Sequence, residues 1–300
     1  MKRSFRAGLS VGSFAMTVLF LALASAFFVG LNNVLIRKGL NHTSQIQSNV
    51  VSVAVAAAIF LLVSLAMGKA GSFFTSAAIM FFLSGLLGPG IGRTLNITSI
   101  NRIGVSRTIP IIGMAPLFAT LFAIMFMDAQ YSLYIFAGMA LIIFGVFVLS
   151  RRKENGKRVF DKKDLLIPLA AAAFGGVSMA TTKIALGGLA DPIVGATLAL
   201  SAALGVVAGY AAGTKQIRTI HFTRKEIMFP ALSGCAMAAG FFFNFSALQD
   251  GDVAVVASVF STFPLFGVFL SHFFLREEIT GRTWLATAII VVGIVVIQVF

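Results

Sequence analysis

The chain has 300 residues, of which 58% are hydrophobic and only 11% are charged, and its formal net charge is +13. A soluble globular protein carries about 25% charged residues, so a large water-covered surface is excluded. Disorder is excluded as well, because it requires low hydrophobicity. The basic residues stand between apolar runs rather than along one face, so we expect no nucleic-acid partner. The single cysteine, Cys235, excludes a disulfide within the chain and a cysteine-based metal site.

Ten runs of the sequence are long and apolar enough to cross a bilayer, which takes about 20 residues. They lie at roughly 13–36, 46–67, 72–95, 103–127, 131–150, 164–186, 192–212, 227–248, 252–275 and 282–300. The connections are mostly short, so neighbouring helices should run antiparallel. The runs lack the alternation of barrel strands. We therefore expect an all-α, polytopic membrane protein with ten transmembrane helices.

The first run resembles a secretory signal, with Lys2, Arg3 and Arg6 before an apolar stretch and Ala24-Ser25-Ala26 as a cleavage-like triplet. The same pattern recurs in the middle of the chain, where no cleavage could occur. We therefore interpret this run as a retained first helix.

The two halves of the sequence match each other, and such internal repeats indicate the architecture directly. Residues 23–30 match 169–176, and this register continues from Arg37 to Lys183. Further along, Asn96 falls opposite Asn244. Residues 115–118 then fall opposite 263–266, and Gly145 falls opposite Gly293.

Each half therefore holds five helices, in residues 1–150 and 164–300, and the polar run 151–163 reads as a basic, solvated linker. An odd number of helices places the second half upside down relative to the first. Inverted repeats of this kind recur in transporters, where the substrate site lies near the midplane between them.

The segments 263–266 and 275–280 resemble the end of the ninth helix and the following turn in the EamA branch of the drug/metabolite transporter superfamily. The first half departs from this pattern, because residues 127–130 lack the matching glutamate. The resemblance covers nearly the whole chain. It implies a basket of ten helices around a central cavity, both termini in the cytoplasm, and transport of small metabolites, often amino acids.

Two arginines are the most unusual residues within the predicted spans. Arg93 follows Gly88-Pro89-Gly90-Ile91-Gly92, where we expect a broken or kinked helix that lines a cavity or packs closely through its glycines. Arg107, beside Thr108, lies about one turn into the next span. Both either extend to the membrane interface or form an anion-binding pole, since a guanidinium suits carboxylate or phosphate. No Asp or Glu lies deep in a span to neutralise them.

Other polar residues complete the candidate substrate-binding set. Asn96 and Asn244 either bind a ligand or join helices, because an amide both donates and accepts hydrogen bonds. The remaining candidates are Asn32, Asn33, Thr108, Ser178 and Phe242. Pro89, Gly90, Pro116 and Pro264 are predicted bending points for gating.

The leading functional hypothesis is a secondary transporter for a small polar metabolite that bears a carboxylate or a phosphate. A lipid flippase that uses the same cavity and a non-transporting membrane scaffold are the alternatives. We expect no enzymatic activity, no catalytic residues, no cofactor and no metal, because no motif for such chemistry is present. We expect a monomer or a homodimer in a prokaryotic cytoplasmic membrane. Loop charges place the termini outside, against the resemblance, so orientation and direction of transport stay open.

Overall fold

The computed structural model describes residues 2–40, 42–103, 108, 111–150, 162–214, 223–275 and 281–299, and these residues form helices and short connections without strands. Seven of its helices are long and apolar enough to cross a membrane. Three shorter apolar helices lie at Ala115–Phe126, Leu133–Val148 and Gly281–Ile297, within the remaining predicted spans. The chain is therefore a multi-pass membrane protein.

The first half contains α1 (Lys2–Gly39), α2 (Gln45–Ala66), the 3-10 helix η1 (Lys69–Phe74), α3 (Ser76–Gly85), the π-helix η2 (Leu86–Gly92), α4 (Arg93–Ile103), α6 (Ala115–Phe126) and α7 (Leu133–Ser150). The second half contains the 3-10 helix η3 (Lys162–Leu165), α8 (Leu166–Gly188), α9 (Pro192–Gly213), α10 (Arg224–Asp250), α11 (Val253–Phe260), α12 (Phe263–Leu275) and α13 (Gly281–Val299).

Capping residues in the sequence set the starts of several helices. Ser44 caps α2 by accepting a hydrogen bond from the N–H of Gln47, and Asp191 caps α9 in the same way. Thr223 and Glu226 form a capping box at the start of α10. These side chains satisfy backbone N–H groups that the first helical turn leaves without partners.

The third predicted span is displaced relative to the sequence prediction. The sequence predicts it at 72–95, whereas the apolar span lies at Ser76–Ile100 in a helical segment that continues through α4 to Ile103. The polar residues Arg93 and Asn96 lower the hydropathy there and made the run end early in the sequence. Pro89 does not end the helix, because the π-helix η2 accommodates it.

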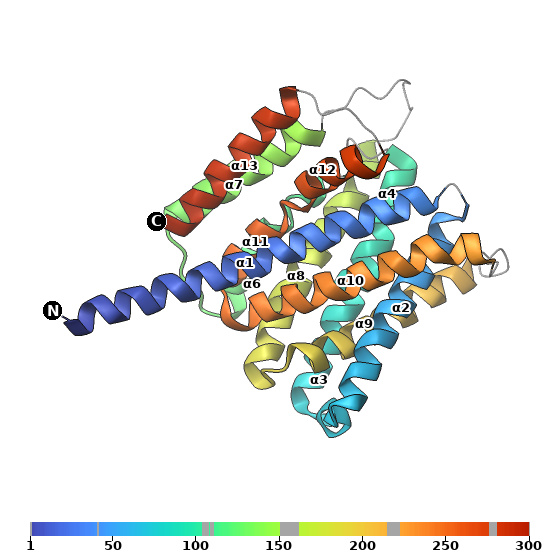
Figure 1. The fold of residues 1–300 in the computed structure, drawn as a ribbon, viewed down its shortest axis with the longest axis horizontal. Helices are drawn as coiled ribbons and strands as arrows, with labels where there is room; N and C mark the ends of the chain where they lie inside the picture. The colour runs from blue at the N-terminus through green and yellow to red at the C-terminus, as the bar shows by residue number, and fades with distance from the viewer. Residues whose placement is uncertain are drawn as a thin grey trace.

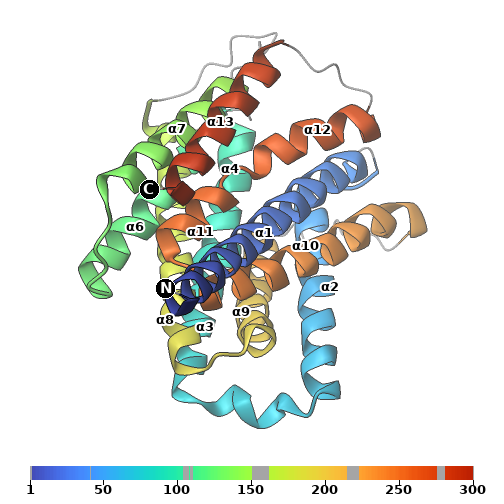
Figure 2. The same cartoon turned by 60° about the vertical axis from the view of Figure 1, so that its left-hand side comes forward.

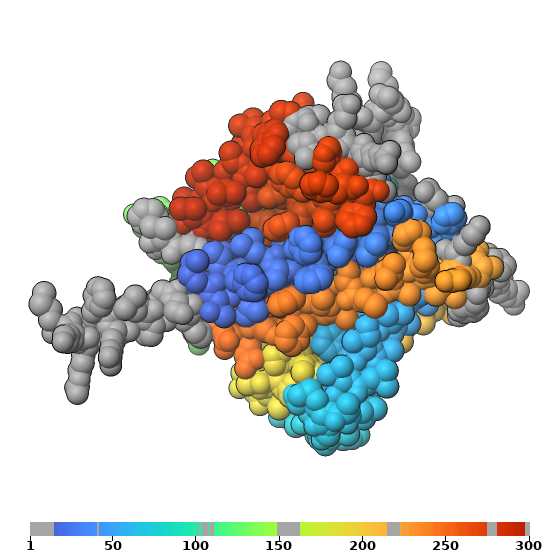
Figure 3. Space-filling view, viewed as in Figure 1, coloured from blue at the N-terminus to red at the C-terminus, as the bar shows by residue number. Residues whose placement is uncertain are grey.

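The helices of the two halves make equivalent contacts. α1 packs against α10 and α12, and its counterpart α8 packs against α3 and α6. α2 packs against α10, and its counterpart α9 packs against α3. α2 also contacts α9, and α7 contacts α13 at one edge of the molecule (Figures 1 and 2). Figure 3 shows α1 and α10 side by side across one face, with α12 and α2 flanking them.

The contacts around two glycines show that the halves are equivalent down to single atoms. Gly30 and Gly176 are repeat partners, and in each a Cβ would collide with one backbone N, one carbonyl O and one Cβ. The atoms near Gly30 belong to Phe263, Phe266 and Gly267, and those near Gly176 belong to Ala115, Phe118 and Ala119. These are repeat-related residues, so the register predicted from the sequence matches the contacts between helices.

The contact between α7 and α13 is also formed by repeat-related residues on both sides. A Cβ on Gly145 would meet Ile290 and the carbonyl O of Ala286, and a Cβ on Gly293 would meet Ile142 and the carbonyl O of Gly138. Close backbone approach through small residues is typical of helix pairs in membranes.

The π-helix η2 marks the main difference between the halves. Leu83-Ser84-Gly85 matches Leu232-Ser233-Gly234, a match that the sequence analysis missed. The spacing from Ser84 to Asn96 is one residue longer than the spacing from Ser233 to Asn244. A π-bulge is a single turn of π-helix within an α-helix, and here η2 accommodates the extra residue.

Two helices are interrupted at equivalent places before a proline. Pro116 is the second residue of α6, which follows a turn at 113–114, and Pro264 is the second residue of α12, which follows a turn at 261–262. The N–H of Leu117 bonds the carbonyl of Met114, just as the N–H of Leu265 bonds the carbonyl of Thr262. Both prolines therefore begin a helix, where the missing N–H costs no hydrogen bond.

Candidate functional site

Arg93 begins α4, directly after the π-helix, and its side chain crosses to two other helices. Its Nε donates a 2.5 Å hydrogen bond to Oδ1 of Asn49 on α2, and one terminal nitrogen lies 3.4 Å from Oγ of Ser52. The other terminal nitrogen lies 3.7 Å from the sulfur of Met237 on α10. The guanidinium therefore lies between helices, with part of the residue still accessible.

The groups that hold Arg93 are all neutral. Asn49, Ser52 and Met237 are buried, with exposures of 5%, 0% and 2%. Asp191 pairs with Lys69 and Asp164 pairs with Arg102, so neither of these carboxylates neutralises Arg93. An amide oxygen, a hydroxyl and a thioether orient the guanidinium but do not cancel its charge.

The second half lacks this polar group. Arg93 corresponds to Phe241 in the register that relates Asn96 to Asn244. When the cap residues Ser44 and Asp191 are taken as equivalent, Asn49 and Ser52 correspond to Ala196 and Ala199. The polar group around Arg93 is therefore present only once, although the helices around it are paired.

The two predicted asparagines have atoms without hydrogen-bond partners. Among the described residues, the buried Oδ1 of Asn96 and the buried Nδ2 of Asn244 make no hydrogen bond. Asn96 lies three residues after Arg93, so both side chains share one face of α4. A buried amide atom without a partner costs free energy, and a ligand could satisfy it.

Three other candidates form hydrogen bonds between helical segments. Asn32 donates a 2.7 Å bond to the carbonyl of Ser233, and its counterpart Ser178 donates a 2.7 Å bond to the carbonyl of Ser84. Thr108 shares a 2.8 Å hydroxyl bond with Ser99. The contacts of Asn32 and Ser178 are repeat-related, and they join α1 to α10 and α8 to α3.

Two further candidates, Asn33 and Phe242, take no part in these contacts. Asn33 is exposed, as is Phe242, at 41%. Arg107 lies outside the described residues, so its position relative to Arg93 stays a prediction. Gly90 is buried within the π-helix beside Pro89.

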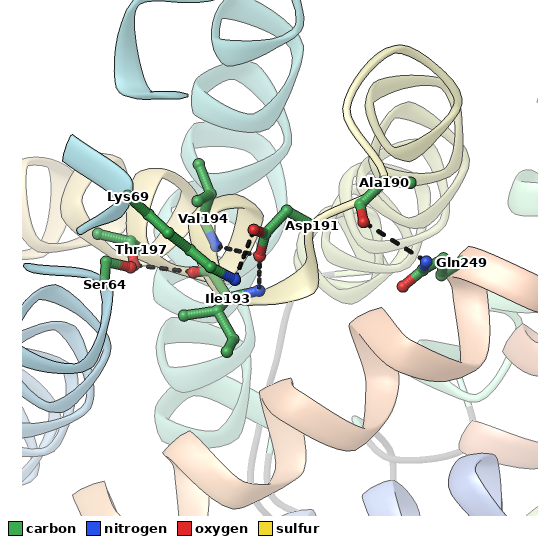
Figure 4. Close-up of polar contacts among 8 residues, drawn as sticks. All are labelled: Ser64, Lys69, Ala190, Asp191, Ile193, Val194, Thr197 and Gln249. Atoms are coloured by element: carbon green, nitrogen blue, oxygen red, sulfur yellow. Dashed lines mark hydrogen bonds and ion pairs between the residues drawn. The ribbon is translucent and has the colours of Figure 1, made fainter. Parts of the chain in front are cut away.

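One end of the bundle is held together by polar contacts between α2, η1 and α9 (Figure 4). Nζ of Lys69 lies 2.6 Å from a carboxylate oxygen of Asp191, and the hydroxyls of Ser64 and Thr197 lie 2.8 Å apart. Nearby, the side-chain amide of Gln249 donates to the carbonyl of Ala190 at 3.5 Å. The corresponding cap at the other end is Ser44, which has no charge to form such an ion pair.

A second polar contact closes the same end. Tyr131, in the connection between α6 and α7, bonds the carboxylate of Asp252, which caps α11. Burial, and then the charge of Asp252, raise the pKa of the Tyr131 hydroxyl above its ordinary range. Lys183 donates a 2.9 Å bond to the carbonyl of Gln249.

Sequence reasoning missed Asn49, Ser52 and Met237. The signal for the first two was the polar stretch 44–52 at the start of the second predicted span, where Asn49 and Ser52 lie three residues apart. No sequence signal distinguishes Met237 from the other apolar residues of α10.

Comparison with known proteins agrees with this architecture. No curated protein matches the sequence. A solved structure described as "Crystal structure of protein" superposes with a TM-score of 0.75 at 16% identity, over 95% of this chain and 96% of that one. At such low identity the likeness shows the fold alone. Two segments, 16–151 and 162–299, match the model of the EamA-like transporter family, and the chain belongs to that family.

Proposed function

We propose that this protein is a secondary transporter that moves a small polar metabolite with a carboxylate or a phosphate by alternating access. Ten transmembrane helices would form two inverted repeats, 1–150 and 164–300, around a central cavity. Membership of a transporter family supports the activity. The equivalent contacts of α1 and α8, and of α2 and α9, support a two-fold relation between the repeats.

The charge of Arg93 is the observation that carries the proposed substrate class. A permanently charged group held inside a helical bundle by neutral partners is costly, and such residues mark substrate pathways. A carboxylate or phosphate would neutralise the charge and accept hydrogen bonds from the guanidinium. Asn96, with its unpartnered Oδ1 on the same helix face, would contact the polar remainder of the substrate.

Two features support alternating access. The interruptions before Pro116 and Pro264 lie at repeat-related positions, and discontinuous helices line the substrate sites of many transporters. The contacts of Lys69 with Asp191 and of Tyr131 with Asp252 close one end of the bundle. Rocking of one repeat against the other would break these contacts and open that end. We place the protein in a prokaryotic cell membrane, as a monomer or a homodimer.

The first test is the thermal stability of the purified protein in detergent against a panel of ligands. The panel holds amino acids, nucleosides, sugar phosphates, nucleotide sugars and anionic lipids. A ligand at about a hundred times its Kd should stabilise the folded state by roughly 2.7 kcal/mol. A shift with anionic metabolites supports the proposal. A shift with lipids alone would instead support lipid translocation.

Two arginine variants then test the residue that carries the proposal. Arg93→Gln should abolish the ligand-dependent shift and transport into proteoliposomes. Arg102→Gln is the matched control, because Arg102 lies on the same helix but is exposed and pairs with Asp164. Arg102→Gln should transport like the wild type. Wild-type transport by Arg93→Gln would refute the anion site.

A further inference from the structure

Position 49 holds the shortest contact of Arg93. Oδ1 of Asn49 accepts the Nε–H of Arg93 at 2.5 Å, and Asn49 is 5% exposed on the inner face of α2. Of the guanidinium nitrogens, Nε allows the least freedom, since it is fixed in the side-chain stem. A partner at Nε therefore sets the direction in which the two terminal nitrogens point.

An aspartate at position 49 would have nearly the same size and the same acceptor atom. A charged acceptor makes a hydrogen bond to arginine that is roughly twice as strong as a neutral one. The chain has an amide at this position, a hydroxyl at Ser52 and a thioether at Met237. Each of the three orients the guanidinium and leaves its charge uncompensated.

We propose that Asn49 is a positioning residue that determines specificity, because it fixes the guanidinium of Arg93 while keeping its positive charge available to an anionic ligand. This inference rests on the proposed function and adds the residue that selects for anions. The equivalent position in the second half is Ala196, and the residue equivalent to Arg93 is Phe241. One chain should therefore bind one anion.

The test compares Asn49→Asp with Asn49→Ala and with Ser48→Ala as the matched control. Ser48 is fully buried on the same turn, and its hydroxyl has no hydrogen-bond partner among the described residues. The probes are sodium phosphate and sodium succinate, each measured against sodium chloride at equal ionic strength. The readouts are the unfolding midpoint without probe and the half-saturating probe concentration.

Asn49→Asp should raise the midpoint without probe, because Arg93 gains a charged partner, and should abolish the response to both probes. A purely structural role for position 49 would change the midpoint but leave the response to both probes as in the wild type. Asn49→Ala should raise the half-saturating concentration by about tenfold, the ratio expected for one hydrogen bond to a charged group. Ser48→Ala should respond like the wild type.

The outcomes separate this inference from the proposed function. A wild-type response to the probes in Asn49→Asp would overturn the inference, and so would equal responses of Asn49→Ala and Ser48→Ala. The second comparison decides the matter if Asn49→Asp does not fold. If the wild type responds to neither these probes nor the anionic metabolites of the wider panel, the proposed anion specificity fails, and the role of Asn49 fails with it. If the wild type responds to the probes but the position 49 variants do not behave as expected, the proposed function is retained and the role of Asn49 is rejected.

Discussion

At the scale of single residues, glycines control how closely the helices approach. Gly30 on α1 and Gly176 on α8 each lie against the backbone of a helix that begins with a proline-containing turn. Any side chain there would push the helix that follows the interruption away from its neighbour. These two positions therefore hold the interrupted helices in place in both halves.

Gly30→Ala and Gly176→Ala should each destabilise the protein by about 1–3 kcal/mol, the usual cost of overpacking a tight contact. Gly267→Ala is the control, because a Cβ there meets nothing within 4 Å. The measurement is the midpoint of thermal unfolding in detergent. We expect the first two variants to lose stability alike and the control to keep it. A loss in only one of the two repeat partners would contradict the equivalence of the halves.

At the scale of helices, the π-helix η2 accommodates one extra residue between two sets of contacts that both halves share. Upstream, the carbonyl of Ser84 accepts the hydroxyl of Ser178, as the carbonyl of Ser233 accepts the amide of Asn32. Downstream, Asn96 and Asn244 keep their common register. In the second half, α10 lacks the extra residue and makes the equivalent contacts while its own backbone stays α-helical.

Deletion of Leu87 should therefore be tolerated, because it converts η2 into the α-helical form that α10 already has. Deletion of Ala236 from α10 should prevent folding, because this helix has no π-helix to absorb the loss and its two ends would leave register by about 100°. Size-exclusion profiles and unfolding midpoints of the two deletions provide the measurement. Equal loss of folded protein would show that the π-helix does not absorb the difference.

The contacts between helices of the two halves could be predicted from the sequence, whereas the contacts of Arg93 could not. The repeat register placed Gly30 opposite Gly176 and Phe118 opposite Phe266, and the helix contacts match it. The polar stretch 44–52 marks Asn49 and Ser52 as unusual in a membrane span, but their contact with Arg93 could not be predicted, because the rest of α2 is apolar around its circumference and no face marks what it packs against. The Leu-Ser-Gly match was missed because one inserted residue shifts it out of the register downstream.

At the scale of the whole molecule, the two ends differ in charge. The end that carries both termini in Figure 1 holds Asp128, Asp191, Asp250 and Asp252, and its basic residues are Lys2, Arg3, Arg6, Lys69 and Lys183. The opposite end holds Arg37, Lys38, Arg102, Lys163, Arg224 and Arg282, and the basic linker joins helices there. Basic loops stay in the cytoplasm.

We therefore expect both termini to lie on the non-cytoplasmic side, against the orientation that the family resemblance implies. A C-terminal alkaline phosphatase fusion should be active, and a C-terminal green fluorescent protein fusion should be dark. In a Cys235→Ala background, a cysteine at the exposed Thr214, which lies at the opposite end, should resist a membrane-impermeant thiol reagent applied to whole cells. A fluorescent C-terminal fusion would reverse the assignment.

The extra residue of the π-helix corresponds to a single codon. If two separate copies of a five-helix unit were translated from one gene, both would contain that codon. A dimer of them would then have the same residues in its two subunits. Joining the copies in one reading frame allows the codon to be present in only one of them. The same freedom allows Arg93 in one half and Phe241 in the other. Because both halves lie in one chain, a two-fold scaffold can have a polar group on one side only.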